Sequence, residues 1–380
     1  MKKTLAAVAV LGAFAGSALA ADVQLYGIVD EGLAYSHVDL DGAADATDKF
    51  SMNSGMQSGS RFGFKGTEDL GNGLTVGFVL ENGFSADTGA DNSTFFDREA
   101  SLFIEGGFGK LAFGKIGSIN CGTSSWAQIG VLSAFGTSNW GGYSNQIGST
   151  ASTGGVMDNT IAYQTPNFAG FTVFAQYSMG DDGDQKDFKG SENESSMDRY
   201  YAIGAKYANG PLTAYLAVDS INYATFGAFG DPYADDSLTV TLGGNYNFEV
   251  AQIFFGAQYF DEVKTFGDLV KNVGFASKIK GYGLNLSANI PVAGGKIMAG
   301  LGYVDAEAAD SVADNVETAG NKDNEFQRYI VSAGYDYPFS KRTDAYVVAS
   351  YMQDSVDYGT ATDDRDPSAF TFVVGLRHKF

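Results

Sequence analysis

The sequence predicts an all-β protein: a transmembrane antiparallel β-barrel of about sixteen strands, with short periplasmic turns and long extracellular loops. Three observations predict this fold. Apolar and polar residues alternate along the chain, short and long connections alternate, and beyond residue 20 no apolar run approaches the roughly 18 residues of a spanning helix. Composition agrees, because the 380 residues include 50 Gly, 29 Phe and 21 Tyr but only 6 Pro. Such usage favours strands over a helical bundle.

The alternation has a period of two. In residues 237–246, Leu238 and Val240 fall on one face, whereas Thr239 and Thr241 fall on the other, as in a strand with one apolar side. The same pattern recurs at 171–178, 212–219, 251–260, 281–290 and 370–380. These segments predict strands whose two faces meet different surroundings.

The connections predict the size of the barrel. Tight turns containing Gly, Asn or Pro fall at 69–73, 106–109, 166–170, 209–210, 247–250, 293–295 and 338–343. Long polar segments such as 179–198, 222–236 and 307–325 lie between them, a layout that a soluble sandwich does not require. The hairpins at these turns, with the first and last strands, give a total of about sixteen. A barrel of that size encloses an aqueous lumen, so its polar faces can point inward.

The first 20 residues predict a secretory signal peptide. Lys2 and Lys3 precede an apolar stretch at 5–14, and Ala18 and Ala20 supply the small residues that signal peptidase accepts. We therefore expect export, cleavage before Ala21, and one barrel domain over residues 21–380.

Charge and residue counts exclude several function classes. A formal net charge of -21 argues against nucleic acid as a partner. With His37, His378 and Cys121 as the only His and Cys residues, HExxH and CxxC motifs are impossible. We find no nucleophile elbow and no complete EF-hand, so we expect no enzyme, no metal and no cofactor. The acidic residues gather in the long segments, which predicts a solvated acidic rim, with specific divalent-cation sites in these segments as the alternative.

Several motifs together resemble the general Gram-negative porins, most closely those of the Neisseria and Burkholderia kind. They are LYGIVD at 25–30, SRFGFKGTEDLG at 60–71, FDR at 96–98, FGKLAFGK at 108–115, NTIAYQTPNF at 159–168 and GLRHKF at 375–380. The resemblance implies an outer-membrane homotrimer, in contact with lipid and lipopolysaccharide, through which ions and small hydrophilic solutes diffuse. It also implies a third loop folded into the lumen. The barrel-assembly machinery would then read the last strand through Phe372, Val374, Leu376 and Phe380.

The resemblance also gives candidate constriction residues. Arg61 and Arg98 match two bases of the family's wall, with Lys115 as a weaker candidate, and Asp30 and Glu81 are candidate acids on polar strand faces. Two features depart from the family: Val156 stands near a place where a third base is common, and the third loop, residues 116–157, carries no charged residue or His. With no loop acid to oppose the arginines, we expect weak selectivity that favours anions at high salt.

The aromatic residues of this loop leave an alternative open. They are Trp126, Phe135, Trp140 and Tyr143, and we expect them to pack the loop against the wall, although a sugar-selective channel would use them to stack carbohydrate rings. A second alternative is an adhesin-like interaction protein. A third is a membrane enzyme with a site around His37, Asp39 and Asp41, but a lone His at a strand end is usually structural.

Overall fold

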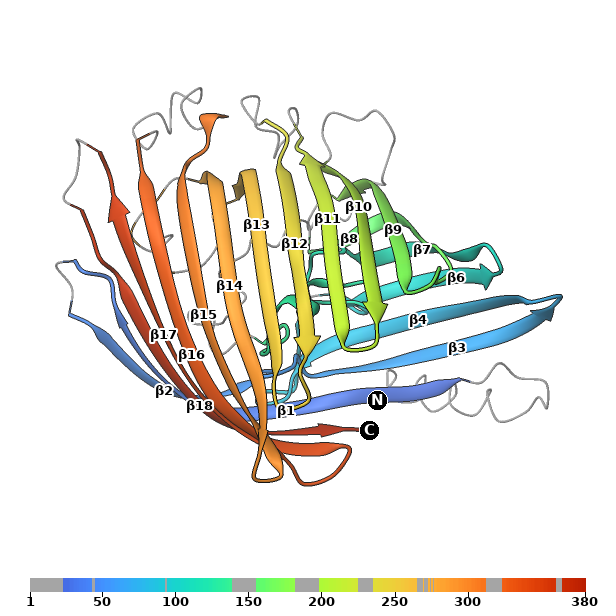
Figure 1. The fold of residues 1–380 in the computed structure, drawn as a ribbon, viewed down its shortest axis with the longest axis horizontal. Coiled ribbons are helices and arrows are strands. Elements are labelled where there is room, and N and C mark those ends of the chain that lie inside the picture. Colours follow the sequence, from blue (N-terminus) through green and yellow to red (C-terminus); the bar gives the residue numbers. More distant parts are fainter. Residues whose placement is uncertain are drawn as a thin grey trace, which may run out of the picture.

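The computed structural model describes residues 23–42, 45–92, 94–138, 155–181, 198–224, 235–264, 269, 273, 275, 277–311, 323–359 and 364–380. In this part of the chain the strands form one antiparallel sheet that closes on itself (Figure 1). No helix among these residues is long and apolar enough to cross a membrane.

Eighteen strand segments make up the sixteen strands of the barrel. The segments are β1 (Gln24–Asp39), β2 (Thr47–Ser54), β3 (Arg61–Gly71), β4 (Leu74–Ser85), β5 (Ala90–Asp91), β6 (Glu99–Gly106), β7 (Gly109–Gly117), β8 (Val156–Gln164), β9 (Phe171–Asp181), β10 (Asp198–Asn209), β11 (Leu212–Asn222), β12 (Leu238–Asn247), β13 (Gln252–Lys264), β14 (Lys278–Val292), β15 (Gly295–Ala308), β16 (Glu325–Pro338), β17 (Thr343–Asp357) and β18 (Ser368–Lys379). Both β2 and β3 pair with β1, so they are two halves of one barrel strand, and β5 is a two-residue addition to β4. The predicted fold is confirmed.

All seven predicted turns join neighbouring strands. They connect β3 to β4, β6 to β7, β8 to β9, β10 to β11, β12 to β13, β14 to β15 and β16 to β17. The strand ends to which the long segments connect lie at the opposite rim, as in outer-membrane barrels.

The barrel closes where the last strand meets the first. β1 and β18 pair from Ile28 opposite Lys379 to Asp39 opposite Ser368. Beyond them, the backbone of Gly27 exchanges hydrogen bonds of 3.2 and 3.1 Å with that of Phe380. A Cβ on Gly27 would lie 2.6 Å from the backbone oxygen of Arg61 and 2.3 Å from Cζ of Phe380, so the close approach of the β3 backbone requires glycine here.

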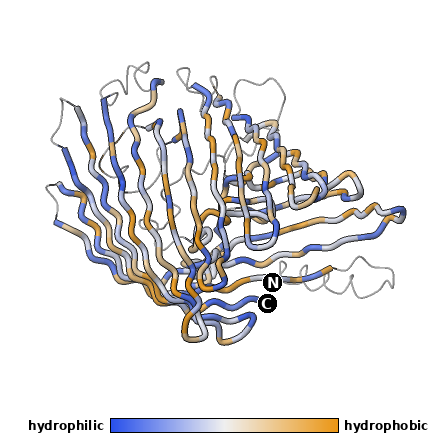
Figure 2. The backbone as a smooth tube through the Cα atoms, viewed as in Figure 1, coloured by the Kyte–Doolittle hydropathy of each residue, from blue (hydrophilic) through white to orange (hydrophobic). Residues whose placement is uncertain are grey.

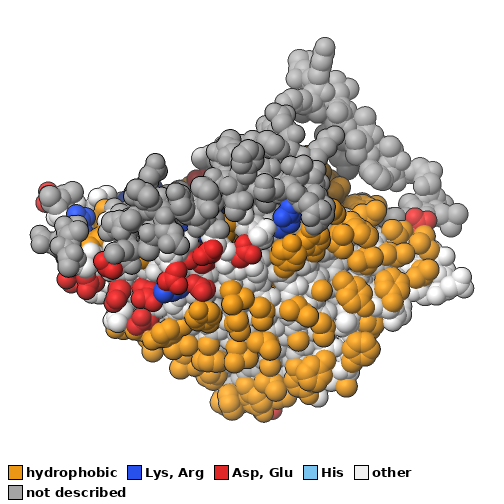
Figure 3. Space-filling view, turned by 90° about the horizontal axis from the view of Figure 1, so that it is seen from above, with side chains coloured by type: hydrophobic (Ala, Val, Ile, Leu, Met, Phe, Trp, Pro, Cys, Tyr) orange, Lys and Arg blue, Asp and Glu red, His pale blue; other side chains and the backbone are white. Residues whose placement is uncertain are grey.

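The strands present an apolar outer face. Hydropathy alternates along them (Figure 2), and one view shows a broad apolar field with a row of Asp and Glu along one border (Figure 3). The four residues of the last strand predicted to be read during assembly share the outer face: Phe372, Val374, Leu376 and Phe380 are 40%, 48%, 52% and 44% exposed. Large apolar side chains on this scale suit a surface that meets lipid.

The segment after β7 folds inward, as predicted. We call residues 118–138 the inner loop; it contains the short 3-10 helix η1 (Ile129–Leu132). Trp126 and Phe135 are 2% and 1% exposed and pack the loop among wall side chains. Trp140 and Tyr143, the other two aromatic candidates, lie outside the described residues.

Candidate pore constriction

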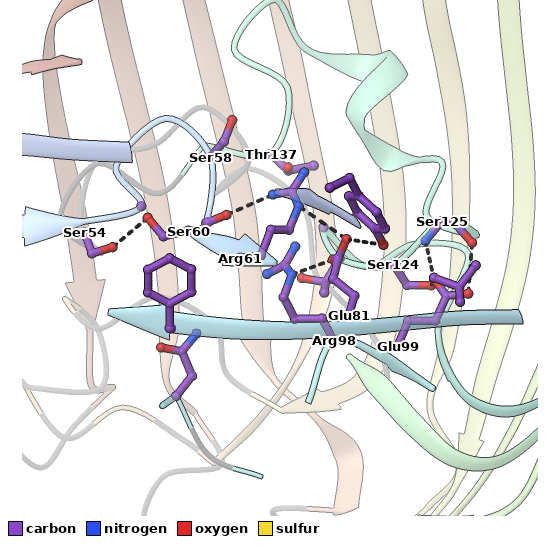
Figure 4. Close-up of a pocket in the computed structure, with 18 of the residues that line it drawn as sticks. Ser54, Ser58, Ser60, Arg61, Glu81, Arg98, Glu99, Ser124, Ser125 and Thr137 are labelled. Atoms are coloured by element: carbon purple, nitrogen blue, oxygen red, sulfur yellow. Dashed lines mark hydrogen bonds and ion pairs between the residues drawn. The ribbon is translucent and has the colours of Figure 1, made fainter. Parts of the chain in front are cut away.

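A cavity of about 590 Å³ lies between the barrel wall and the inner loop. We call it the constriction cavity (Figure 4). β3 supplies Arg61, β4 supplies Glu81, and Arg98 and Glu99 stand at the start of β6. Alternation along β3 explains the direction of Arg61, since Phe62 belongs to the opposite face.

One carboxylate joins the two arginines. Nε of Arg98 lies 2.7 Å from Oε1 of Glu81, and Nε of Arg61 lies 3.4 Å from its Oε2. The Tyr26 hydroxyl donates to the same Oε2 at 3.0 Å. Glu81 lines the cavity but is only 9% exposed, and its negative charge is held against both guanidinium groups. The group carries two positive charges and one negative charge when all three side chains are ionised.

Hydroxyl groups supply much of the remaining polar lining. They come from the 54–60 connection, the end of β4 and the inner loop: Ser54, Ser58, Ser60, Ser85, Thr123, Ser124, Ser125 and Thr137. Hydroxyls both donate and accept hydrogen bonds, so the lining can replace the hydration of a polar solute of either sign.

Glu99 fixes one end of the inner loop. Its carboxylate accepts hydrogen bonds from Oγ of Ser124 (3.0 Å), N of Ser125 (2.8 Å) and Oγ of Ser125 (3.0 Å). Glu99 is 1% exposed, so the accepting carboxylate is buried although the serines line the cavity. The uncharged loop is therefore held by a charge that the wall provides.

Asp219 of β11 holds the loop from the other side. Nδ2 of Asn120 donates to its Oδ2 at 3.1 Å, and the hydroxyl of Tyr200 donates to the same oxygen at 2.9 Å. Thr239 donates to Oδ1. Asn120 in turn accepts from the hydroxyl of Tyr215 at 2.9 Å. This network extends from the loop across the neighbouring strands β10, β11 and β12.

Cys121 adjoins this network. Its thiol is 2% exposed and donates to the carbonyl of Thr123 at 2.7 Å, and burial raises the pKa of the thiol to about 11. Since the thiolate is the reactive form, we expect slow alkylation of Cys121 in the folded protein.

Comparison with known proteins assigns the chain. The family described as "Gram-negative porin" matches residues 6–357. The chain belongs to that family. It is 32% identical over 411 residues to an outer membrane porin protein of Bordetella pertussis, covering 100% of both chains. It is 31% identical over 356 residues to outer membrane porin protein 32 of Delftia acidovorans, covering 93% of this chain and 90% of that one.

A solved structure agrees with this assignment. The anion-selective porin from Comamonas acidovorans is similar with a TM-score of 0.68 and 26% identity, covering 95% of this chain and 100% of that chain. The protein is thus an outer-membrane β-barrel of the porin family.

The porin brings three of its predicted site residues together and separates two others. Arg61, Arg98 and Glu81 line the constriction cavity. Asp30 is fully buried and accepts hydrogen bonds from N of Ser58 (2.6 Å) and from other groups, so it supports the 55–60 connection outside the cavity lining. Lys115 is paired with Asp158 at 2.6 Å and does not line the cavity either.

Sequence reasoning missed Tyr26, Glu99 and Asp219 of this porin. Tyr26 and Glu99 have the alternation of lumen-facing residues, which was a usable signal. Asp219 also follows this alternation. Its contact with Asn120, however, joins residues 99 positions apart, and no local sequence pattern indicates that contact. Among the described residues, no group of three or more His, Cys, Asp and Glu is placed to hold a metal ion.

Proposed function

We propose that this porin forms a water-filled channel through which ions and small hydrophilic solutes cross the outer membrane by passive diffusion, without catalysis. The constriction cavity carries the proposal, because charged and hydroxyl side chains line an opening of about 590 Å³ inside a closed barrel. A barrel of this size encloses a water-filled lumen, and such a lumen lets small polar solutes of different shapes pass.

We propose a weak preference for anions at the constriction. Glu81 offsets one of the two arginine charges, so the preference is smaller than two unopposed arginines would give. The anion-selective relative supports the sign.

Single-channel recording in planar bilayers tests the channel. Purified protein should insert in discrete conductance steps whose size grows with salt concentration, and small neutral sugars should pass without saturable block. Absence of steps from folded protein would reject the channel, and saturable sugar block would replace the general pore with a selective one.

The channel is proposed to be a homotrimer. Apolar side chains on the outer face of the first strands support this, with Leu25, Phe50 and Met52 at 57%, 72% and 59% exposure. Phe95, in the connection between β4 and β6, is 71% exposed and available to a neighbour. Unboiled samples should migrate in detergent gels as a species of about three chains that heating converts to one. A folded monomer after gentle extraction would contradict the trimer.

Export is proposed to proceed through a cleaved signal peptide at residues 1–20, which lie outside the described residues. Intact-mass measurement of protein from outer membranes should give a chain that starts at Ala21. A mature chain that keeps Lys2 and Lys3 would contradict it. We also propose that the assembly machinery reads the outward residues of β18, and that lipid and lipopolysaccharide surround the barrel.

A further inference from the structure

A second cavity adjoins the constriction cavity on the side of the short turns. It measures about 250 Å³, and its lining includes Lys65, Lys110, Phe103, Val79 and Ser125. We call it the periplasmic crevice. Lys65, Val79 and Ser125 line both cavities, so a solute that leaves one meets the other. The volume lies below the roughly 300–1,000 Å³ of pockets for drug-sized ligands, which suits a smaller ion.

The crevice holds two ammonium groups over aromatic rings. Nζ of Lys110 lies 4.0 Å from the ring centroid of Phe103 and 5.3 Å from that of Trp126. Nζ of Lys65 lies 5.1 Å from the centroid of Tyr26. A ring face attracts the cation but does not neutralise its charge.

No carboxylate of the described residues forms an ion pair with either lysine, whereas Arg61, Arg98, Lys115 and Lys296 are all paired. Glu105 stands opposite Lys110 in the strand register but is exposed, and the ammonium group lies over Phe103 instead. Neither ammonium group is therefore occupied by an ion pair in the described part of the chain, so both can contact an anion from solution.

The wall of the crevice is apolar and fixed in place. Phe103 is 8% exposed, and its ring lies against Gly77, where a Cβ would be 2.4 Å from its Cζ. Val79 and Phe78 complete the apolar part of the lining. The constriction cavity, in contrast, offers hydroxyls and guanidinium groups. The periplasmic crevice, with two ammonium groups beside an apolar wall, therefore suits a different solute from the constriction cavity, which is lined by hydroxyls.

We propose that the periplasmic crevice is a second anion site, which binds small organic anions with a compact apolar body, such as aryl carboxylates. The carboxylate contacts the ammonium groups of Lys65 and Lys110, and the apolar body packs on Phe103 and Val79. Inorganic anions gain the charge contact but not the apolar one. This inference rests on the proposed channel function.

Current block in planar bilayers tests the site. Benzoate, acetate and inorganic phosphate are added in turn to each side of channels that carry chloride, and the half-blocking concentration is measured. We expect benzoate to block at the lowest concentration. Each unit charge at contact distance in water is worth about fivefold in affinity, so K65Q together with K110Q should weaken benzoate block by about tenfold or more. Phe103→Leu should weaken benzoate block by about threefold and leave acetate unchanged, because only the aromatic contact is lost.

Lys296→Gln is the matched control. Lys296 stands beside the turn between β14 and β15, but its Nζ lies 3.6 Å from Asp336 and it does not line the crevice. Benzoate block should be unchanged in this variant. Equal block by the three anions, or equal benzoate block in wild type and the double variant, would overturn the site while the channel stands. Folded protein without conductance would overturn the channel itself.

Discussion

Replacing Glu81 by glutamine should make the channel several-fold more anion-selective. This carboxylate lies 2.7 Å from Arg98 and 3.4 Å from Arg61, so it offsets the charge of both. Removing a unit charge about 4–8 Å from a permeating ion in water changes its free energy by about 0.5–1 kcal/mol, which is about two- to fivefold in preference. Reversal potentials across a potassium chloride gradient measure the change. It should be largest at low salt and decrease towards molar salt, where charges are screened within about 3 Å.

Two variants control this prediction. Tyr26→Phe removes the hydrogen bond to Glu81 without a change of charge, so its selectivity should stay close to that of wild type. Arg61→Ser together with Arg98→Ser should shift the reversal potential towards cations, since Glu81 is then unopposed. If the Glu81 variant leaves the reversal potential unchanged, ions do not pass this cluster.

The cluster of Arg61, Arg98 and Glu81 shows that the sequence indicates which charged residues face the lumen but not which of them are in contact. The absence of charge from residues 116–157 indicated that no acid of the third loop opposes the arginines. Glu81 opposes them from the wall, because β4 lies between β3 and β6 and brings its polar face to both. Alternation identified Glu81 as inward-facing. It could not give the 2.7 Å contact, which depends on the register of neighbouring strands.

The fold was predictable because its signals are local. Strand period and turn residues can be read within about ten positions, and closure follows once all strands have one lipid-facing side. The interruption between β2 and β3 was not predicted. Residues 55–60 fold over Asp30, and the backbone N–H groups of Gln57 and Ser58 donate hydrogen bonds to its carboxylate. Alternation assigned Asp30 to the inner face, but whether an inner residue is open or covered depends on chain segments far from it in the sequence.

The position of the inner loop should depend on Asp219. In Asp219→Asn, a neutral amide replaces a carboxylate that accepts hydrogen bonds from Asn120, Tyr200 and Thr239. Hydrogen bonds to a charged group contribute about 1.5–3 kcal/mol each, and the amide can still accept some of them. A net loss of about 2 kcal/mol in loop attachment would raise the detached population about thirtyfold. The barrel itself should remain folded, since its strand pairing does not involve this side chain.

Cys121 reports on this detachment. Its thiol is 2% exposed beside Asn120, with a pKa raised to about 11, so both burial and the low thiolate fraction slow its alkylation at pH 8. Release of the loop should expose the Cys121 thiol to water and lower the pKa of the thiol towards its ordinary value. Both changes speed alkylation. We expect Asp219→Asn to speed alkylation by a small polar reagent by about tenfold or more, and single-channel records to show larger and noisier currents.

Glu262→Gln is the matched control for this prediction. Glu262 is also a buried wall carboxylate that accepts hydrogen bonds from a connection, here from N of Ser311 at 2.8 Å and from its hydroxyl. Glu262 also pairs with Nζ of Lys278 at 3.6 Å, so the substitution disturbs the wall at least as much as Asp219→Asn does, but Glu262 contacts no part of the inner loop. Cys121 should therefore react at the wild-type rate in Glu262→Gln. Equal acceleration in both variants would mean that general loosening of the barrel exposes the thiol. Acceleration in Asp219→Asn alone would mean that this carboxylate keeps the inner loop across the lumen and so determines the width of the constriction.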